Sequence, residues 1–183
     1  MKNKTRQLTV NAILLAVGLL LHQITPAIGL PIQPDMSLIM LFTLMIMNKK
    51  EYKTIFICAL IIGIFSALTT KFPAGQIPNI IDKVVTANIV FVLMYIIYNN
   101  PFIKKLDDKK QDFIVSIFIL PIGTLISGSV FLLSASILVG LPGSFYALFL
   151  VAVAPAILIN LIVGVFVNKI VNISVKRIAH NVN

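Results

Sequence analysis

The chain has 183 residues, of which 58% are hydrophobic and 11% charged, and its mean hydropathy is +1.01. Soluble domains carry roughly 25% charged residues, so this chain has too little polar surface to be covered by water. The net charge of +9 does not indicate nucleic-acid binding, because the bases gather in short clusters between apolar runs. The composition predicts a multi-pass protein of the cell membrane.

Six apolar runs predict an all-α integral membrane bundle of six transmembrane helices, forming a single membrane domain over residues 1–183. The predicted helices cover residues 8–25, 35–47, 54–70, 79–98, 112–138 and 144–171. All of the 15 Lys and Arg residues except Lys71 and Lys83 lie on alternate connections. By the positive-inside rule, both chain ends are then cytoplasmic, and residues 69–83 lie at the extracytoplasmic surface.

The first two predicted helices have unusual features. The first resembles a secretory signal, but no Ala-x-Ala type cleavage site follows it, so we expect a retained helix. The second has about 13 residues and extends about 20 Å, short of a hydrocarbon core of about 30 Å. We therefore expect the Pro-rich connection at 26–34 to dip into the protein at membrane depth. Further along, Pro121 and Pro155 are expected to kink their helices.

Polar residues cluster at the start of the helix predicted at 79–98. Asn79, Asp82, Lys83 and Thr86 have the spacing i, i+3, i+4 and i+7, which places them on one helical face. Charged groups facing lipid are costly, so the stripe is expected to face the bundle and bind substrate. The alternative is local: Asn79 caps the helix, Asp82 favours its dipole and Lys83 reaches outward to water.

Other polar and small residues admit two interpretations. Asp35 begins the second helix, where it either caps the helix or contacts substrate. Small residues on the helix at 112–138 (Gly123, Ser127, Gly128, Ser129, Ser134 and Ser136) either line a pocket or allow close packing. Ala59, Gly63 and Ala67 are expected to pack internally. Asn160 lies about 24 Å below the outer end of its helix, so we expect an inter-helix hydrogen bond outside the site.

Enzyme and metal signatures are missing from the sequence. His22 and His180 are the only histidines and lie at opposite ends of the chain, so no His-rich metal cluster is expected. No HExxH, GxSxG, Walker A or GxGxxG motif occurs. The single cysteine, Cys58, excludes an intramolecular disulfide. We expect no enzyme activity and no cofactor, and any ATP-driven transport requires a separate ATPase.

Six short helices, a basic cytoplasmic side and the pair Ala12-x-x-x-Ala16 resemble the S components of energy-coupling factor (ECF) transporters. Three segments are similar to the tryptophan-specific S component: 33–36 (QPDM), 64–70 (IFSALTT) and 72–83 (FPAGQIPNIIDK). The likeness covers most of the chain and is strongest at 64–86. Gln33 departs from it, since a base is expected there.

The resemblance implies substrate capture from outside, with Ala12 and Ala16 facing a transmembrane coupling subunit attached to two ATPase subunits. The predicted substrate-binding residues are Asp35, Phe72, Gln76, Asn79, Asp82, Lys83, Thr86, Phe145 and Tyr146. For a tryptophan ligand, Asp82 or Asp35 would meet the ammonium group and Lys83 the carboxylate. Gln76 or Asn79 would accept the indole N–H. The aromatic residues would pack on the ring, although Phe145 and Tyr146 are also typical interfacial residues.

Three alternatives remain at this point. The chain is an S component for another small molecule, such as a vitamin; an intramembrane enzyme; or a structural protein whose polar stripe only caps a helix. An enzyme is disfavoured because no paired catalytic residues lie at membrane depth. Association with an ATPase pair separates the S-component interpretations from the other two.

Overall fold

The computed structural model describes residues 4–25 and 35–180, without the side chains of 175–180. The described residues form helices and no strands: α1 (Lys4–Ile24), α2 (Ser37–Met47), α3 (Tyr52–Thr69), α4 (Gln76–Asn99), α5 (Pro101–Lys104), α6 (Asp108–Leu138), α7 (Phe145–Leu148), a π-helical segment (Phe149–Val153) and α8 (Ala154–His180). The predicted all-α class is confirmed. The expected re-entrant connection at 26–34 lies outside the described residues.

Five stretches are long and apolar enough to cross a membrane: α1, α3, α4, α6 and the continuous stretch Phe145–Ser174. The predicted sixth span, α2, has 11 residues, which extend only about 16 Å. That length is about half of a hydrocarbon core, so the predicted count of six spans is not confirmed by the described residues.

The short helix α2 lies at the centre of the bundle. It packs against α1, α3, α6 and α8, and every residue from Ser37 to Ile46 is buried. A helix that is apolar all round is stable only when neighbours cover it on every side. Two core clusters meet on α2, one toward α4 and α6 and the other toward α1 and α3. The site-bearing helices are thus assembled around it.

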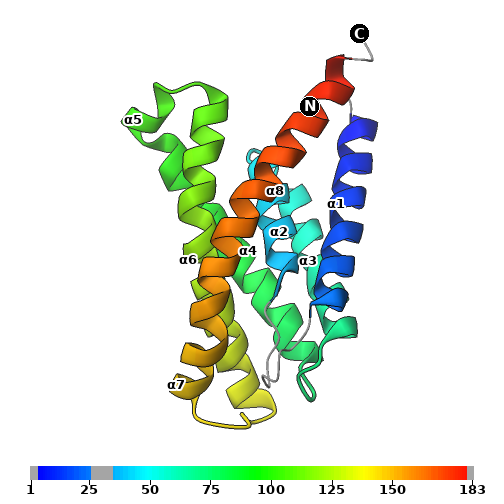
Figure 1. Cartoon of the computed structure of the whole chain (residues 1–183), viewed down its shortest axis with the longest axis vertical. Helices are drawn as coiled ribbons and strands as arrows, with labels where there is room; N and C mark the ends of the chain where they lie inside the picture. The colour runs from blue at the N-terminus through cyan, green and yellow to red at the C-terminus, as the bar shows by residue number, and fades with distance from the viewer. Residues whose placement is uncertain (1–3, 26–34, 181–183) are drawn as a thin grey trace.

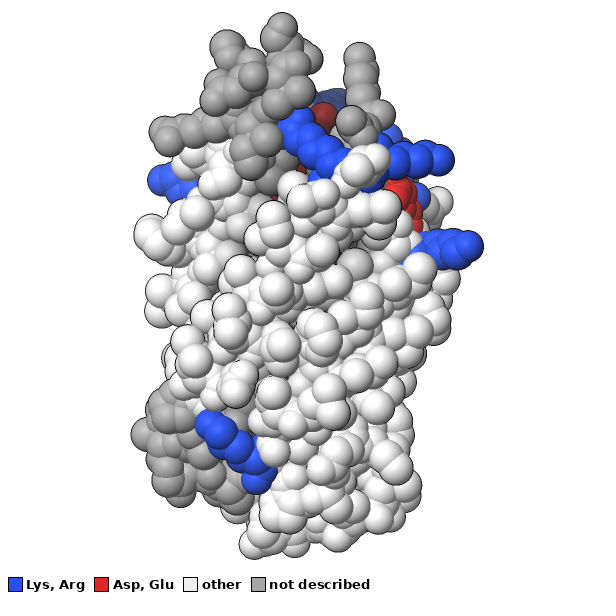
Figure 2. Space-filling model, turned by 90° about the vertical axis from the view of Figure 1, so that its right-hand side faces the viewer, with Lys and Arg blue, Asp and Glu red and all other residues white. Residues whose placement is uncertain are grey.

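The helix α1 begins and α8 ends at one end of the bundle, while α7 lies at the other (Figure 1). Figure 2 shows basic side chains gathered at the first end, above a belt without charged side chains. Exposed apolar residues of the long helices include Leu20, Val92, Leu133 and Ile162. We call the two ends the basic end and the pocket end, the latter carrying the connections at 70–75 and 139–144. The side of the membrane that each end faces stays a prediction.

Close approach of α3 and α4 positions the polar stripe of α4. A Cβ atom placed on Gly63 would lie 3.2 Å from Ile80 Cα, and Ala59 and Ala67 are buried on the same face. The prediction that these small residues pack internally is confirmed. Because Ile80 and Lys83 of α4 leave no room for a side chain at Gly63, the two helices pack closely at this level.

The two interior prolines behave differently. The helix α6 runs through Pro121 without interruption. Pro155 is the second residue after the π-helical segment Phe149–Val153. Proline has no N–H for the usual helical bond and its ring crowds the preceding turn, which favours local departures from α-helical geometry. This departure lies at the pocket end, where Ala152 and Val153 face a cavity.

Candidate functional site

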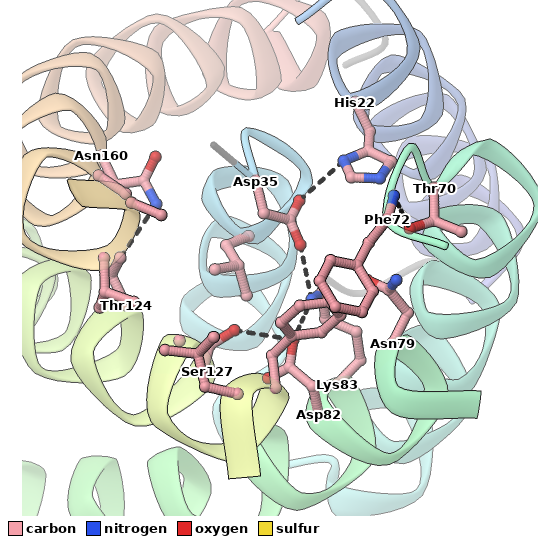
Figure 3. A pocket seen from close by; sticks show the side chains of 17 residues that line it. His22, Asp35, Thr70, Phe72, Asn79, Asp82, Lys83, Thr124, Ser127 and Asn160 are labelled. Atoms are coloured by element: carbon pink, nitrogen blue, oxygen red, sulfur yellow. Dashed lines mark hydrogen bonds and ion pairs between the residues drawn. The ribbon is translucent and has the colours of Figure 1, made fainter. Parts of the chain in front are cut away.

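A cavity with about 630 Å³ of empty space, partly open to solvent, lies at the pocket end. Its lining comes from α1, α2, the connection after α3, α4, α6, the π-helical segment and α8 (Figure 3). The cavity has a charged wall and an apolar wall, which are described in turn.

Lys83 is the centre of the charged wall. Its side chain is 1% exposed, and its ammonium lies 2.6 Å from Asp35 Oδ2 and also pairs with Asp82. Removing an ammonium group from water costs several kcal/mol unless carboxylates and hydrogen bonds replace the water. Two carboxylates from different parts of the chain therefore fix Lys83 in the bundle interior.

Asp82 connects α4 with α6. Its Oδ1 accepts a hydrogen bond from Thr86 Oγ1 at 2.9 Å, and its Oδ2 accepts one from Ser127 Oγ at 2.9 Å. With Lys83 as a third partner, the Asp82 carboxylate is 1% exposed and well supplied with donors. Because the hydrogen-bonding capacity of this carboxylate is met by protein donors, we infer that Asp82 has a structural role and holds Lys83 in place.

Asp35 approaches Lys83 from the start of α2. Its Oδ1 accepts a hydrogen bond from Ser37 N at 2.9 Å and lies 3.2 Å from His22 Nδ1. Burial opposes ionisation of Asp35, but Lys83 and His22 hold the pKa of this carboxyl well below its usual range. Asp35 therefore both supports the first turn of α2 and presents a carboxylate to the cavity, so the two interpretations of Asp35 are compatible.

The second set of lining side chains is apolar, and we call it the apolar wall. Phe72 and Phe131 make an edge-to-face contact with ring centroids 5.4 Å apart, a favourable geometry for aromatic pairs. Small and aliphatic side chains continue this wall: Leu38, Leu132, Ala152, Val153 and Ala156. Gly128 also lines the cavity and packs against Val153, which a Cβ on the glycine would meet at 2.5 Å. The wall suits a flat, apolar ligand group.

The cavity includes five of the predicted substrate-binding residues. These are Asp35, Phe72, Asn79, Asp82 and Lys83. Thr86 is buried behind them and contacts Asp82. The structure does not bring Gln76, Phe145 or Tyr146 into the lining: all three are exposed, and the Phe145 ring stacks on Phe149.

The purely local interpretation of the polar stripe is wrong. The helix α4 begins at Gln76 and is capped by Gly75, so Asn79 is not the cap and instead donates from Nδ2 to Gly75 O at 2.8 Å. Lys83 does not reach outward to water. The prediction that the stripe faces the bundle interior is confirmed, since all four side chains are buried.

Sequence reasoning missed His22 and misplaced Asn160. His22 lies near the end of α1, where it contacts Asp35. The sequence suggested it only as a possible metal ligand. Asn160 forms the expected inter-helix bond, from Nδ2 to Thr124 Oγ1 at 3.1 Å, but it also lines the cavity. The expectation that it lies too deep is wrong, because the cavity extends between α6 and α8.

Among the described residues, no group of three His, Cys, Asp or Glu residues is placed to hold a metal ion.

The small residues of α6 serve both of their suggested roles. Ser127 and Gly128 line the cavity together with Thr124. Gly123 instead permits close packing, since a Cβ there would lie 2.5 Å from the Phe42 ring. The side chains of Ser129 and Ser134 bond to backbone carbonyls of their own helix.

Comparison with known proteins gives a consistent result. The model of the family "Tryptophan transporter TrpP" matches residues 4–176. A "Probable tryptophan transport protein" of Clostridium perfringens is 45% identical over 176 residues, covering 96% of each chain. Proteins with the same description from Clostridium acetobutylicum and Bacillus subtilis are 46% identical over 167 residues and 40% identical over 174 residues, covering 91–92% and 95% of the two chains compared. No solved structure matches.

Proposed function

The chain belongs to the tryptophan transporter TrpP family, and from this premise we propose that it binds L-tryptophan in the cavity at the pocket end. Family and relatives are transport proteins, and this chain is a multi-pass membrane transport protein rather than an enzyme. The proposal concerns the ligand, its site and the source of energy.

The observation that carries the proposal is the division of the cavity into a charged wall and an aromatic wall. A zwitterionic head group needs both signs of charge, which Asp35 and Lys83 supply. An indole ring needs a flat apolar surface, which Phe72 and Phe131 supply. Tryptophan combines the two requirements in one molecule.

We assign the ammonium group to Asp35 rather than to Asp82. Asp82 already has Lys83, Thr86 and Ser127 as partners, whereas Asp35 lies at the cavity with its side chain 16% exposed. The substrate carboxylate approaches Lys83, which exchanges one of its two protein partners for it. The cluster thereby keeps paired charges throughout binding, which avoids the cost of a buried single charge.

Burial of the ring and contacts to the head group both contribute favourable free energy to binding. An aromatic side chain of 150–250 Å² buried at about 25 cal/mol/Å² contributes roughly 4–6 kcal/mol before entropic costs. Each charge-assisted hydrogen bond to the head group adds roughly 1.5–3 kcal/mol.

Ligand fluorescence tests the binding proposal, because the protein contains no tryptophan of its own. Titration of the purified chain is expected to give a saturable signal that unlabelled tryptophan reverses and common vitamins do not. Asp35→Asn is expected to weaken binding by about 10- to 100-fold, as for loss of one charge-assisted contact. Lys71→Met is the control, since Lys71 is exposed and, among the described residues, donates to Thr25 O rather than to a residue that lines the cavity. Equal affinity of wild type and Asp35→Asn would contradict the assigned role.

We also propose that the chain is the S component of an ECF-type importer. The support is the resemblance described above, the lack of any ATPase motif in the sequence, and the exposure of Ala12 and Ala16 on α1. Residues on the opposite side of α1, such as Leu14 and Gly18, are buried against the bundle. The alanine face of α1 is therefore available to a coupling subunit in the membrane. Hydrolysis of ATP by attached ATPases would then reorient the loaded chain.

Replacing the alanines separates docking from binding. Ala12→Leu and Ala16→Leu are expected to leave tryptophan affinity unchanged while abolishing cellular uptake and co-purification with an ATPase pair. Ala147→Leu, at another exposed alanine, is the matched control and is expected to retain uptake. Uptake by the isolated chain in ATP-free vesicles would contradict the S-component proposal without affecting the proposed ligand.

A further inference from the structure

The Asn160 amide lies on the far side of the cavity from His22 and Asn79 (Figure 3). Its side chain is fully buried. Its Nδ2 donates to Thr124 Oγ1 at 3.1 Å, and Thr124 Oγ1 donates to Leu120 O at 2.7 Å. These hydrogen bonds join α8 to α6 near Ala152, Val153 and Ala156 in the cavity lining. We call this part the apolar end of the cavity.

The chain of bonds also determines which way the amide faces. A threonine hydroxyl has one hydrogen, and Thr124 gives it to the Leu120 carbonyl. Toward Asn160, Thr124 can therefore only accept, so the NH₂ group must face Thr124. The opposite amide orientation would place two acceptors against each other. The Asn160 Oδ1 is consequently an acceptor directed away from Thr124.

This acceptor has no hydrogen-bond partner among residues 4–25 and 35–174, whose side chains the structure describes. Buried acceptors are nearly always satisfied, and an unsatisfied one carries a desolvation cost. The neighbouring wall offers no donor at this end, since Ala152, Val153 and Ala156 are apolar. A ligand that brings a hydrogen-bond donor to the apolar end would satisfy this acceptor.

We propose that Asn160 Oδ1 accepts the ring N–H of the substrate and that Asn160 sets specificity for N–H-bearing aromatic amino acids. This inference rests on the proposed binding of tryptophan and adds the residue that distinguishes indole from rings without a donor. It replaces the expectation that Gln76 or Asn79 accepts the indole N–H. Gln76 lies outside the lining, and Asn79 lies beside Lys83 at the charged wall (Figure 3).

The test compares tryptophan with 3-benzothienylalanine, in which sulfur replaces the ring N–H with little change of shape. Affinities are measured by competition against tryptophan fluorescence. The wild type is expected to prefer tryptophan by at least about tenfold, because the analogue leaves a buried acceptor unsatisfied. In Asn160→Leu, the preference is expected to fall below about twofold, with the analogue bound at least as tightly as by wild type.

Asn168→Leu is the matched control. Asn168 is also buried on α8 and donates to a hydroxyl of α6, Ser116 Oγ, at 3.3 Å. It lines a separate groove toward the basic end and not the substrate cavity. This variant is expected to retain the full preference for tryptophan.

Two results would overturn the inference: equal affinity of the wild type for both ligands, or an unchanged preference in Asn160→Leu. The wild-type comparison can overturn the inference even if Asn160→Leu does not fold. If tryptophan itself did not bind to wild type, the proposed ligand would be wrong, an outcome distinct from loss of discrimination alone.

Discussion

Replacement of Lys83 by Met tests whether the buried charge cluster holds the pocket end together. Methionine keeps most of the side-chain length but removes the ammonium that pairs with Asp35 and Asp82. Both carboxylates then lose their cation in a site where Lys83 and Asp82 are each 1% exposed. Breaking a buried ion pair from one side costs about 3–5 kcal/mol.

For a chain of this size, each kcal/mol shifts the melting temperature by about 2–4 °C, so Lys83→Met is expected to lower it by about 6–20 °C. The assay uses Cys58, the single cysteine, which is buried in the core. A thiol-reactive dye reports its exposure on heating of the detergent-solubilised protein. Lys71→Met, which removes an exposed lysine at the same end, is expected to melt within about 2 °C of wild type.

A second substitution distinguishes charge imbalance from lost packing. Asp82→Asn combined with Lys83→Met removes one charge of each sign and is expected to melt at least about 2 °C above Lys83→Met alone. The reasoning would be refuted if Lys83→Met melted like wild type. A double variant less stable than Lys83→Met would refute it as well.

Three further predictions follow from packing, aromatic contact and pH. Gly164→Ala is expected to destabilise the chain by about 1–3 kcal/mol in the same thermal assay, because its Cβ would lie 2.4 Å from Leu120 Cδ2; Gly143→Ala has no such neighbour, and an equal loss there would contradict the argument. Phe131→Leu is expected to weaken tryptophan binding about 3- to 10-fold by removing the aromatic surface, whereas Phe113→Leu, at an exposed position outside the cavity, is expected to leave the titration unchanged. Since Lys83 and His22 lower the pKa of Asp35 despite burial, the stability difference between wild type and Asp35→Asn is expected to be fully present at neutral pH and to persist as pH falls through about 4, disappearing only below that value. Loss of the difference already near pH 5 would show that the pKa of Asp35 is not lowered.

The sequence predicted the helical class, the approximate helix positions and the inward-facing polar stripe. These features depend on local patterns: apolar runs of spanning length, and charged residues at spacing that places them on one helical face. The same reasoning joined Asp82, Lys83 and Asp35 as candidates for one site. Their residue types are costly in a membrane unless they are paired or functional.

Other features depend on tertiary contacts that no local pattern encodes. The central position of α2 requires knowledge of which helices surround it. The cavity lining contributed by α6 and α8 depends on how deeply the space between those helices extends, which a count of residues from the helix end does not give. Asn160 was misplaced for that reason. Gln76 and Tyr146 are near the pocket end in sequence, but their side chains point to the surface.

The most direct test of the account is tryptophan titration of a variant whose cavity is filled. Ala156 lines the cavity and is 7% exposed, so Ala156→Phe occupies the space proposed for the indole ring. Ala154→Phe, two residues earlier in α8 and outside the lining, is the control. The account predicts saturable binding by wild type and Ala154→Phe and a loss of more than about 100-fold in Ala156→Phe, the cost of excluding an aromatic ring. Wild-type affinity in a correctly folded Ala156→Phe variant would contradict the account, because tryptophan would then bind elsewhere.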